Sequence, residues 1–394
     1  MSNSWPTVVL GNICVSANTG LDAIKRAPIV EKYTGIKCLR IQDISQSKPI
    51  SKWGNTEVTD INFEKFRLRT GEIIMARTCS TGLNLLVKED LPAVFNNGLV
   101  RIRADKKSVT PEFLYYLFMS KEFIGHIDGI SGGTSVQLNM QIGDLLSYTF
   151  PLPPLKEQQA IAEVLSSLDD KIDLLHRNNK TLEEMAETLY RQWFVEGAKE
   201  DWEVKTLGTL VSTIVDNRGK TPPTVEFNTG MPLIEVNALN SKSCCVNYSV
   251  IRKFVTEETY NSWFRKHLAV KDIIFSTVGS IGIFSLLMKQ EGVIAQNVVG
   301  LRCSSPFFFY LWLKSNVEVI LSLDIGGVQP SIKLPHLLGL EAKVPADSML
   351  NKFENQVEHI FQKIRMNEEQ IASLTILRDT LLPKLMSGQV RVNH

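Results

Sequence analysis

The hydrophobic pattern of the chain is dominated by one segment, from Leu155 to Phe194. Within it, apolar residues recur at alternating steps of three and four, with one gap filled by Asn179. The seam positions are Ile161, Leu165, Leu168, Ile172, Leu175, Leu182, Ala186, Leu189 and Trp193. This spacing predicts a long helix that offers a narrow apolar seam to a partner helix. Pro153 and Pro154 precede it, where proline can end an incoming strand without interrupting the helix.

A second segment, from Phe353 to Leu385, carries the same pattern. Each seam position follows its counterpart by 192 residues, so that position 161 corresponds to 353 and position 193 to 385. The positions are Phe353, Val357, Ile360, Ile364, Asn367, Ile371, Leu374, Arg378, Leu381 and Leu385. Two unrelated helices on separate cores are the alternative. The shared register favours an internal repeat whose two helices pair with each other.

Each seam contains one asparagine, Asn179 and Asn367. A buried asparagine lowers stability but fixes the register of a helix pair, because its amide must find a partner. We therefore interpret these two as helix-register residues that face each other across an antiparallel pair. Further pairs then follow: Ile161 with Leu385, Leu175 with Ile371, and Leu182 with Ile364.

The segments outside the two helices also repeat, with a period of about 195 residues. Matching stretches are Trp5–Gly11 with Trp202–Gly208, Gly35–Ile41 with Gly230–Val236, Gly71–Ile74 with Lys271–Ile274, and Pro111–Tyr115 with Pro306–Tyr310. The second and third pairs predict strands, and the last predicts a helix opened by proline.

The predicted fold class is therefore α+β. It consists of two repeated mixed α/β globular domains, separated by a pair of long antiparallel coiled-coil helices and related by a pseudo-two-fold internal repeat. The predicted boundaries are 1–153 for the first globular domain, 154–199 for the first long helix, 200–345 for the second globular domain and 346–394 for the second long helix.

Charge and composition add limits to this picture. Residues 1–150 carry 17 basic and 14 acidic side chains, whereas residues 155–200 carry 6 and 10. The mild positive charge of the globular part permits contact with phosphate but does not demonstrate it. The six cysteines have no metal-ligand spacing, so we expect reduced thiols. No long apolar run or signal pattern is present, which favours a cytoplasmic protein without a membrane partner.

The sequence contains no pattern typical of catalysis or of cofactor binding. There is no glycine-rich phosphate loop ending in Lys-Ser or Lys-Thr, and the six histidines form no HxxxH or HExxH pair. We therefore expect no catalytic residue, no metal and no cofactor on this chain. The pattern indicates a binding protein; a nuclease or methyltransferase acting by itself would need a catalytic cluster.

The whole chain resembles the DNA-specificity (S) subunits of type I restriction–modification enzymes. The resemblance rests on the repeated order of domain and helix, on Pro151–Gln158 at the start of the first long helix, and on Leu382–Gly388 at the end of the second. Further similar pieces are Lys37–Ile44, Asp216–Pro222 and Gln329–Ile332. One departure is that the first half has Thr134–Asn139 where the second has Gln-Pro-Ser-Ile.

This resemblance implies two target-recognition domains, each of which reads one half of a bipartite double-stranded DNA site. It implies that the long helices set the gap between the half-sites and dock two methyltransferase (M) subunits. S-adenosylmethionine, ATP and Mg²⁺ are expected on partner subunits. Whether restriction/translocase (R) subunits also join is left open.

Reading DNA in the major groove requires paired donors and acceptors, such as Arg or Lys for guanine and Asn or Gln for adenine. Loops in both halves supply such residues. In the first half we predict DNA contacts by Arg40, Gln42, Arg77, Thr78, Ser80, Gln137 and Asn139. In the second half we predict them by Arg218, Lys220, Asn237, Asn240, Ser280, Gln329, Ser331 and Lys333. The alternative for each is a solvated loop residue or turn cap, and the alternative function is a two-headed protein-interaction scaffold without DNA binding.

Overall fold

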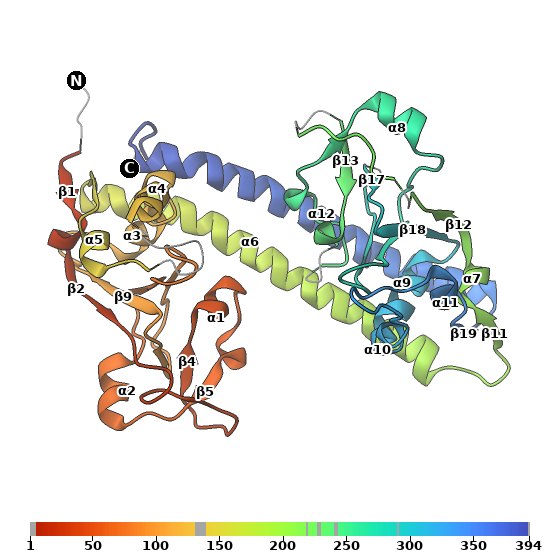
Figure 1. Ribbon diagram of the computed structural model, residues 1–394, viewed down its shortest axis with the longest axis horizontal. Coiled ribbons are helices and arrows are strands. Elements are labelled where there is room, and N and C mark those ends of the chain that lie inside the picture. Colours follow the sequence, from red (N-terminus) through yellow and green to blue (C-terminus); the bar gives the residue numbers. More distant parts are fainter. Residues whose placement is uncertain are drawn as a thin grey trace. The chain divides into compact units, whose positions relative to one another are not determined.

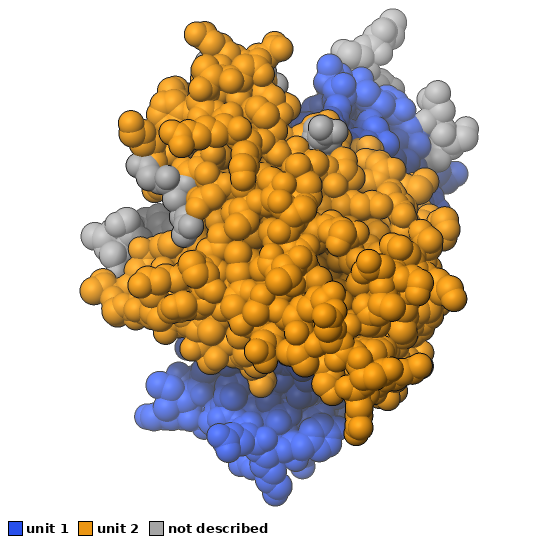
Figure 2. All heavy atoms as spheres, turned by 90° about the vertical axis from the view of Figure 1, so that its right-hand side faces the viewer, with its two compact units in different colours: residues 1–170, 375–394 blue, residues 171–374 orange. Residues whose placement is uncertain are grey.

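The computed structural model describes residues 5–130, 139–217, 220–226, 230–239, 243–289 and 291–392. The chain divides into two compact units, which Figure 2 shows in different colours. Unit 1 consists of residues 1–170 and 375–394, and unit 2 consists of residues 171–374. Each unit therefore combines one globular domain with a part of both long helices.

The described residues of unit 1 form three small sheets (Figure 1). In spatial order, their strands are β1 (Thr7–Val9) and β10 (Thr149–Pro151); β2 (Cys14–Thr19), β9 (Leu99–Ala104), β6 (Glu72–Ala76) and β7 (Asn84–Leu86); and β3 (Ile29–Val30), β5 (Gly54–Thr56), β4 (Lys37–Leu39) and β8 (Ala93–Phe95). Neighbouring strands are antiparallel except β4 and β8, which are parallel.

Strand β6 explains how the core of unit 1 is divided. All five of its residues are buried. Successive side chains of a strand point to opposite faces of the sheet. Ile73 and Met75 accordingly join one apolar cluster, while Ile74 and Ala76 join another. The central four-stranded sheet therefore separates two cores, and after Glu72 the sequence of β6 is a continuous apolar run.

Short helices connect these strands. They are η1 (Leu10–Ile13), α1 (Ile41–Ser45), η2 (Ile50–Lys52), α2 (Asp60–Phe66), α3 (Pro111–Leu117), α4 (Lys121–Ile130) and α5 (Ile142–Leu146). The predicted helix opened by Pro111 is confirmed. Thr110 caps it, with its hydroxyl accepting the Phe113 N–H at 3.3 Å. Such a cap satisfies one of the N–H groups that a helix start leaves unpaired.

Unit 2 repeats this architecture. The strands of its described residues are β11 (Glu203–Thr206) and β19 (Glu341–Val344); β12 (Val211–Val215), β18 (Val298–Cys303), β15 (Ile273–Ser276) and β16 (Phe284–Leu286); and β14 (Phe254–Val255), β13 (Met231–Ile234) and β17 (Val293–Ile294). The four-stranded order β12-β18-β15-β16 corresponds to β2-β9-β6-β7. The first pair of each sheet even carries a register shift at the same place, between Cys14 and Ser16 and between Val211 and Thr213.

The helices of unit 2 follow the same order. They are α7 (Leu207–Leu210), η4 (Val236–Ala238), η5 (Tyr248–Val250), α8 (Glu257–Trp263), α9 (Pro306–Ser315), α10 (Val317–Leu321) and α11 (Leu334–Leu338). On β15, Ile273 and Phe275 join one core while Ile274 joins the other, as on β6. The predicted internal repeat is therefore present in strand order, register and core division.

The two long helices are α6 (Leu155–Tyr190) and α12 (Asp347–Met386). Within unit 1, Ile161 near the start of α6 shares a core with Leu385 near the end of α12. Within unit 2 the order is reversed, because Ala186 near the end of α6 shares a core with Val357 near the start of α12. The helices therefore pair in antiparallel directions, and the predicted α+β fold with two repeated domains and a long helix pair is confirmed.

The end of the first long helix differs from the prediction. A continuous α-helix was expected to Phe194, but the α-helical part ends at Tyr190 and residues Arg191–Glu196 form a π-helical turn. Wider turns of this kind accommodate one extra residue in a helix. The Trp193 ring still packs against Phe353, with ring centroids 5.8 Å apart, so the turn keeps this aromatic contact while the helix type changes.

Candidate functional site

Two matching hairpin loops follow the central strands of the two units. Residues 77–83 connect β6 to β7, and residues 277–283 connect β15 to β16. Each loop closes on a glycine in the left-handed region, Gly82 at φ 85° and Gly282 at φ 69°. Their N–H groups donate to the last strand residues, Ala76 and Ser276, at 3.0 and 3.3 Å. The two loops therefore have one geometry but different side chains.

A second segment is fastened to each hairpin loop by the same backbone contacts. In unit 1, Thr78 and Asn139 form an antiparallel bridge, and Met140 N–H donates to Arg77 C=O at 2.9 Å. In unit 2, Val278 and Ser331 form the equivalent antiparallel bridge. The Ile332 N–H donates to the Thr277 C=O at 2.9 Å. Distant parts of the chain thus meet at one polar edge in each unit.

In unit 1 this edge brings together four of the predicted DNA contacts, Arg77, Thr78, Ser80 and Asn139. Arg77 Nη2 donates to Asn139 Oδ1 at 2.9 Å, and Arg77 Nε approaches Met140 C=O at 3.4 Å. Thr78 lies half-buried beside them, and Ser80 is exposed. Because a guanidinium has five N–H groups in a fixed plane, two directed contacts orient the group while leaving it further donors. Arg77 is therefore the positioned arginine of this edge.

In unit 2 the corresponding edge presents Gln329 and Ser280, both exposed. Gly279 donates its N–H to Pro330 C=O at 3.0 Å. A Cβ on Gly279 would lie 3.4 Å from Gln329 Nε2 and would need the left-handed φ of 84°. The close approach of the two loops therefore suits glycine at this position. The arrangement holds the Gln329 amide beside the hairpin loop.

Arg40 and Gln42 lie elsewhere, at the start of α1. Arg40 Nε pairs with the buried Asp43 carboxylate at 3.2 Å, and that carboxylate also accepts the Arg40 N–H at 3.0 Å. With its oxygen turned toward the arginine, the Gln42 amide accepts from Arg40 Nη2 at 2.8 Å. Much of the donor capacity of Arg40 is therefore used inside the protein, and Gln42 is the exposed member of the pair.

The remaining predicted contacts of unit 2 are dispersed. Lys220 is exposed in the segment after β12, Asn237 is exposed in the turn η4, and Lys333 is exposed directly before α11. Ser331 is half-buried and forms the backbone bridge already described. Three predicted contacts, Gln137, Arg218 and Asn240, lie outside the described residues.

Ion pairs between buried carboxylates and partly exposed arginines at the base of the hairpins were not predicted. Glu72 accepts from Arg103 Nε at 2.6 Å in unit 1, and Asp272 accepts from Arg302 at 2.8 Å in unit 2. Both carboxylates are buried; Glu72 is the first residue of β6, and Asp272 directly precedes β15, so both stand at the start of a strand that leads into a hairpin loop. The repeated acid after Gly71 and after Lys271 was the available signal. A charge in an apolar strand is retained when it is paired and hydrogen-bonded.

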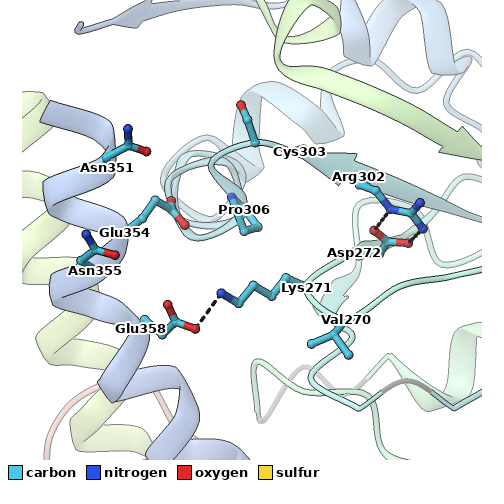
Figure 3. Close-up of a pocket in the computed structure, with 11 residues that line it drawn as sticks. Val270, Lys271, Asp272, Arg302, Cys303, Pro306, Asn351, Glu354, Asn355 and Glu358 are labelled. Carbon is cyan, nitrogen blue, oxygen red and sulfur yellow. Dashed lines mark hydrogen bonds and ion pairs between the residues drawn. The ribbon is translucent and has the colours of Figure 1, made fainter. Parts of the chain in front are cut away.

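The second domain is joined to the long helix α12 through Glu354. Its two carboxylate oxygens accept the N–H groups of Phe308 and Phe307, at 2.8 and 3.3 Å, at the start of α9. Burial raises the pKa of Glu354 to about 7, and these backbone hydrogen bonds and Lys271 oppose that rise. Figure 3 shows the polar cavity of about 610 Å³ beside it, where Lys271 reaches Glu358 at 2.7 Å.

No metal-binding constellation was found among the described residues, where three or more His, Cys, Asp or Glu side chains do not converge. In the same part of the chain, no helix combines the length and apolar character that crossing a membrane requires.

The chain is similar to proteins of one family. A family model described as "Type I restriction modification DNA specificity domain" matches residues 3–184 and again residues 199–360. The type I restriction enzyme MjaIX specificity subunit of Methanocaldococcus jannaschii is 27% identical over 370 residues, which cover 86% of this chain and 83% of that protein. The HindI specificity subunit of Haemophilus influenzae is 23% identical over 411 residues, which cover 83% and 88%.

A solved structure shares the fold. The crystal structure of the type I restriction–modification S subunit from M. genitalium aligns with a TM-score of 0.61 at 18% sequence identity. The alignment covers 98% of this chain and 97% of that chain. The repeated domains and long helices are therefore a fold seen in experiment.

Proposed function

Because the chain belongs to the type I restriction modification DNA specificity family, we propose that it is the non-catalytic specificity subunit of a type I restriction–modification complex. Each globular domain reads one half of a bipartite double-stranded DNA site. The long helices set the gap between the half-sites and dock two methyltransferase subunits. The complex acts in the cytoplasm, where its DNA substrate lies.

The observation that carries this proposal is the matched polar edge of the two units. The same strand order and the same backbone bridges place different side chains on each edge: Arg77 and Asn139 in unit 1, Gln329 and Ser280 in unit 2. Arginine suits guanine, and asparagine or glutamine suits adenine. One scaffold that carries two different sets of readers would recognise an asymmetric, two-part sequence.

In our proposal, catalysis and cofactor binding belong to the partner subunits. The methyltransferase subunits bring S-adenosylmethionine, and restriction subunits, where they join, bring ATP and Mg²⁺. Half-sites read from one face of the duplex lie about one helical turn apart, roughly 34–36 Å. The 36 residues of α6 span about 54 Å at 1.5 Å per residue, so inward-leaning domains or bent DNA would close the difference.

Methylome sequencing tests the proposal. A host with this gene and its methyltransferase partner should carry one bipartite methylated sequence that disappears when this gene is deleted. Exchange of residues 1–153 for another recognition domain should replace one half-site and leave the other. Loss of both half-sites, or a methylome that does not change with the gene, contradicts the proposal.

The spacer role has its own test. Removing one heptad from each helix, residues 172–178 and 368–374, keeps Asn179 and Asn367 and shortens the pair by about 10 Å. The preferred gap should change while both half-sites stay the same. An unchanged gap would show that the helices do not set it. A purified complex whose DNA retention does not respond to salt would favour the alternative, a protein-interaction scaffold.

A further inference from the structure

The loop between α10 and α11 holds an apolar side chain fully in solvent. Val328 exposes 106% of its reference surface, more than the other large apolar side chains that are exposed in the structure's described residues. A single exposed apolar side chain is common on protein surfaces and by itself indicates no function. The interest of Val328 lies in the loop that carries it.

That loop is closed by its own hydrogen bonds. Asp324 Oδ1 accepts the N–H groups of Gly326 and Ser331, both at 2.9 Å. A Cβ on Gly326 would lie 1.9 Å from the Gln329 C=O, so the chain turns there only with glycine. Val328 lies within this closed turn, directly before Gln329.

The loop is also hydrogen-bonded to the β15–β16 hairpin loop, with which it forms the polar edge of unit 2. Pro330 C=O accepts the Gly279 N–H from the β15–β16 loop at 3.0 Å. The bridge between Val278 and Ser331 joins the same two loops. Val328 therefore belongs to the segment that carries Gln329, and its side chain is open to a ligand that approaches this edge.

We propose that Val328 contacts the 5-methyl group of a thymine in the half-site read by unit 2. This inference rests on the proposed function. The thymine methyl is the apolar group that base pairs present in the major groove, where the neighbouring glutamine would pair with adenine. The thymine could be the partner of the adenine that Gln329 contacts, or it could lie in the neighbouring base pair. In either position its methyl group would pack against the exposed valine side chain.

A protein partner is the competing occupant of this loop. Val319, Leu321 and Ile325 are also exposed, in α10 and the segment after it. A protein contact would not depend on a methyl group of the DNA, so a DNA substitution separates the two.

The experiment uses the full chain assembled with its methyltransferase subunits and a duplex that carries its recognition site. Each thymine of the unit 2 half-site is replaced in turn by deoxyuridine, which lacks only the 5-methyl group. Wild-type protein should bind one such duplex roughly fourfold more weakly, as expected for a buried methyl-sized group. V328A should bind the thymine and deoxyuridine duplexes equally at that position. V204A, at another exposed valine of unit 2 on β11, should keep the wild-type preference.

The outcomes separate the two proposals. Specific binding with equal affinity for thymine and deoxyuridine at every position, or a half-site without T·A pairs, overturns the Val328 contact alone. So does a V328A variant that keeps the thymine preference, or one that loses its methyltransferase subunits. A complex that does not distinguish its site from a scrambled duplex overturns the proposed function itself.

Discussion

Asn367 Nδ2 donates a hydrogen bond to Asn179 Oδ1 at 2.7 Å across the seam between α6 and α12. The two side chains are 1% and 3% exposed. Asn179 Nδ2 donates in turn to the Glu368 carboxylate at 2.9 Å. A polar group left without its partner in such a buried place costs about 1–3 kcal/mol. This pair can therefore favour one alignment of the helices over others.

Replacement of one asparagine should be worse than replacement of both. Asn367→Leu removes the donor to Asn179 and should lower the free energy of unfolding by about 1–3 kcal/mol. The double variant N179L/N367L should be more stable than N367L, because two leucines complete the apolar seam. Urea denaturation of the full chain measures both. Asn178→Leu, at an exposed neighbouring position, is the control and should change stability by less than about 0.5 kcal/mol.

Arg77 should read one base pair. Arg77→Ala should weaken discrimination at a single position of the unit 1 half-site by about 1–3 kcal/mol, with the other half-site unaffected. Asn139→Ala should affect the same position, because Asn139 Oδ1 orients the guanidinium. Competition binding against single-base variants of the site measures the effect. Arg69→Ala removes an exposed arginine that pairs with Glu64 and should leave base preference unchanged. Equal loss of affinity for every sequence would identify Arg77 as a phosphate contact.

Two matching positions of the hairpin loops have a left-handed backbone, which favours glycine over other residues. Cys79 adopts φ 61°, which is unusual for a residue with a Cβ, while Gly279 occupies the matching loop at φ 84°. Gly279→Ala should therefore cost about 1–2 kcal/mol of stability, because an L-residue is strained there. Cys79→Gly should cost nothing, since relief of strain offsets the greater freedom of the unfolded chain. Thermal unfolding of both variants tests this, and a destabilised Cys79→Gly would contradict it.

Glu354 should make unit 2 less stable as the pH rises. Its pKa in the folded chain is about 7, raised by burial from an ordinary value of 4.5. The folded state therefore binds a proton more readily, so this contribution to stability is complete below pH 4.5 and is lost as the pH rises through 7. Glu354→Gln removes this titration, although its amide keeps only one acceptor oxygen for the two N–H groups. Its stability should therefore change little between pH 4 and pH 8, whereas wild type should lose about 2–3 kcal/mol over that range. Urea denaturation at the two pH values measures this difference.

Glu358 supplies a control of opposite sign. Its hydrogen bond with Lys271 lowers its pKa. The associated stability is therefore present above the ordinary carboxyl pKa and is lost as the pH falls through the lowered one. Glu358→Gln should have a lower free energy of unfolding than wild type at neutral pH, and this difference should shrink on acidification. The same trend for both variants would show that Glu354 does not titrate as described.

The local sequence around Arg40 contains a signal that argues against its predicted role as a DNA contact. Arg40 stands three residues before Asp43, a spacing at which a carboxylate can accept the backbone N–H of a helix start. In the structure the Asp43 carboxylate accepts the Arg40 N–H in this way, and the Arg40 guanidinium is hydrogen-bonded to Asp43 and Gln42. Fewer of its donors are therefore left for a ligand. Arg77 has no acid at such a spacing, and its partner Asn139 comes from a segment 62 residues away. No local pattern predicts such a pairing.

The sequence by itself determined the repeat, the antiparallel helix pair and the chemistry available at the loops. Periodicity is a local property, and a seam that recurs 192 residues later in the same register leaves few ways to bury its apolar stripe. The tertiary structure alone decided which polar side chains meet. The bridges from Thr78 to Asn139 and from Val278 to Ser331 depend on the folded strands that carry them. The tertiary structure also decided which arginines pair with the buried carboxylates of Glu72 and Asp272. The free-energy cost of an unpaired charge depends on its burial and not on its position in the chain.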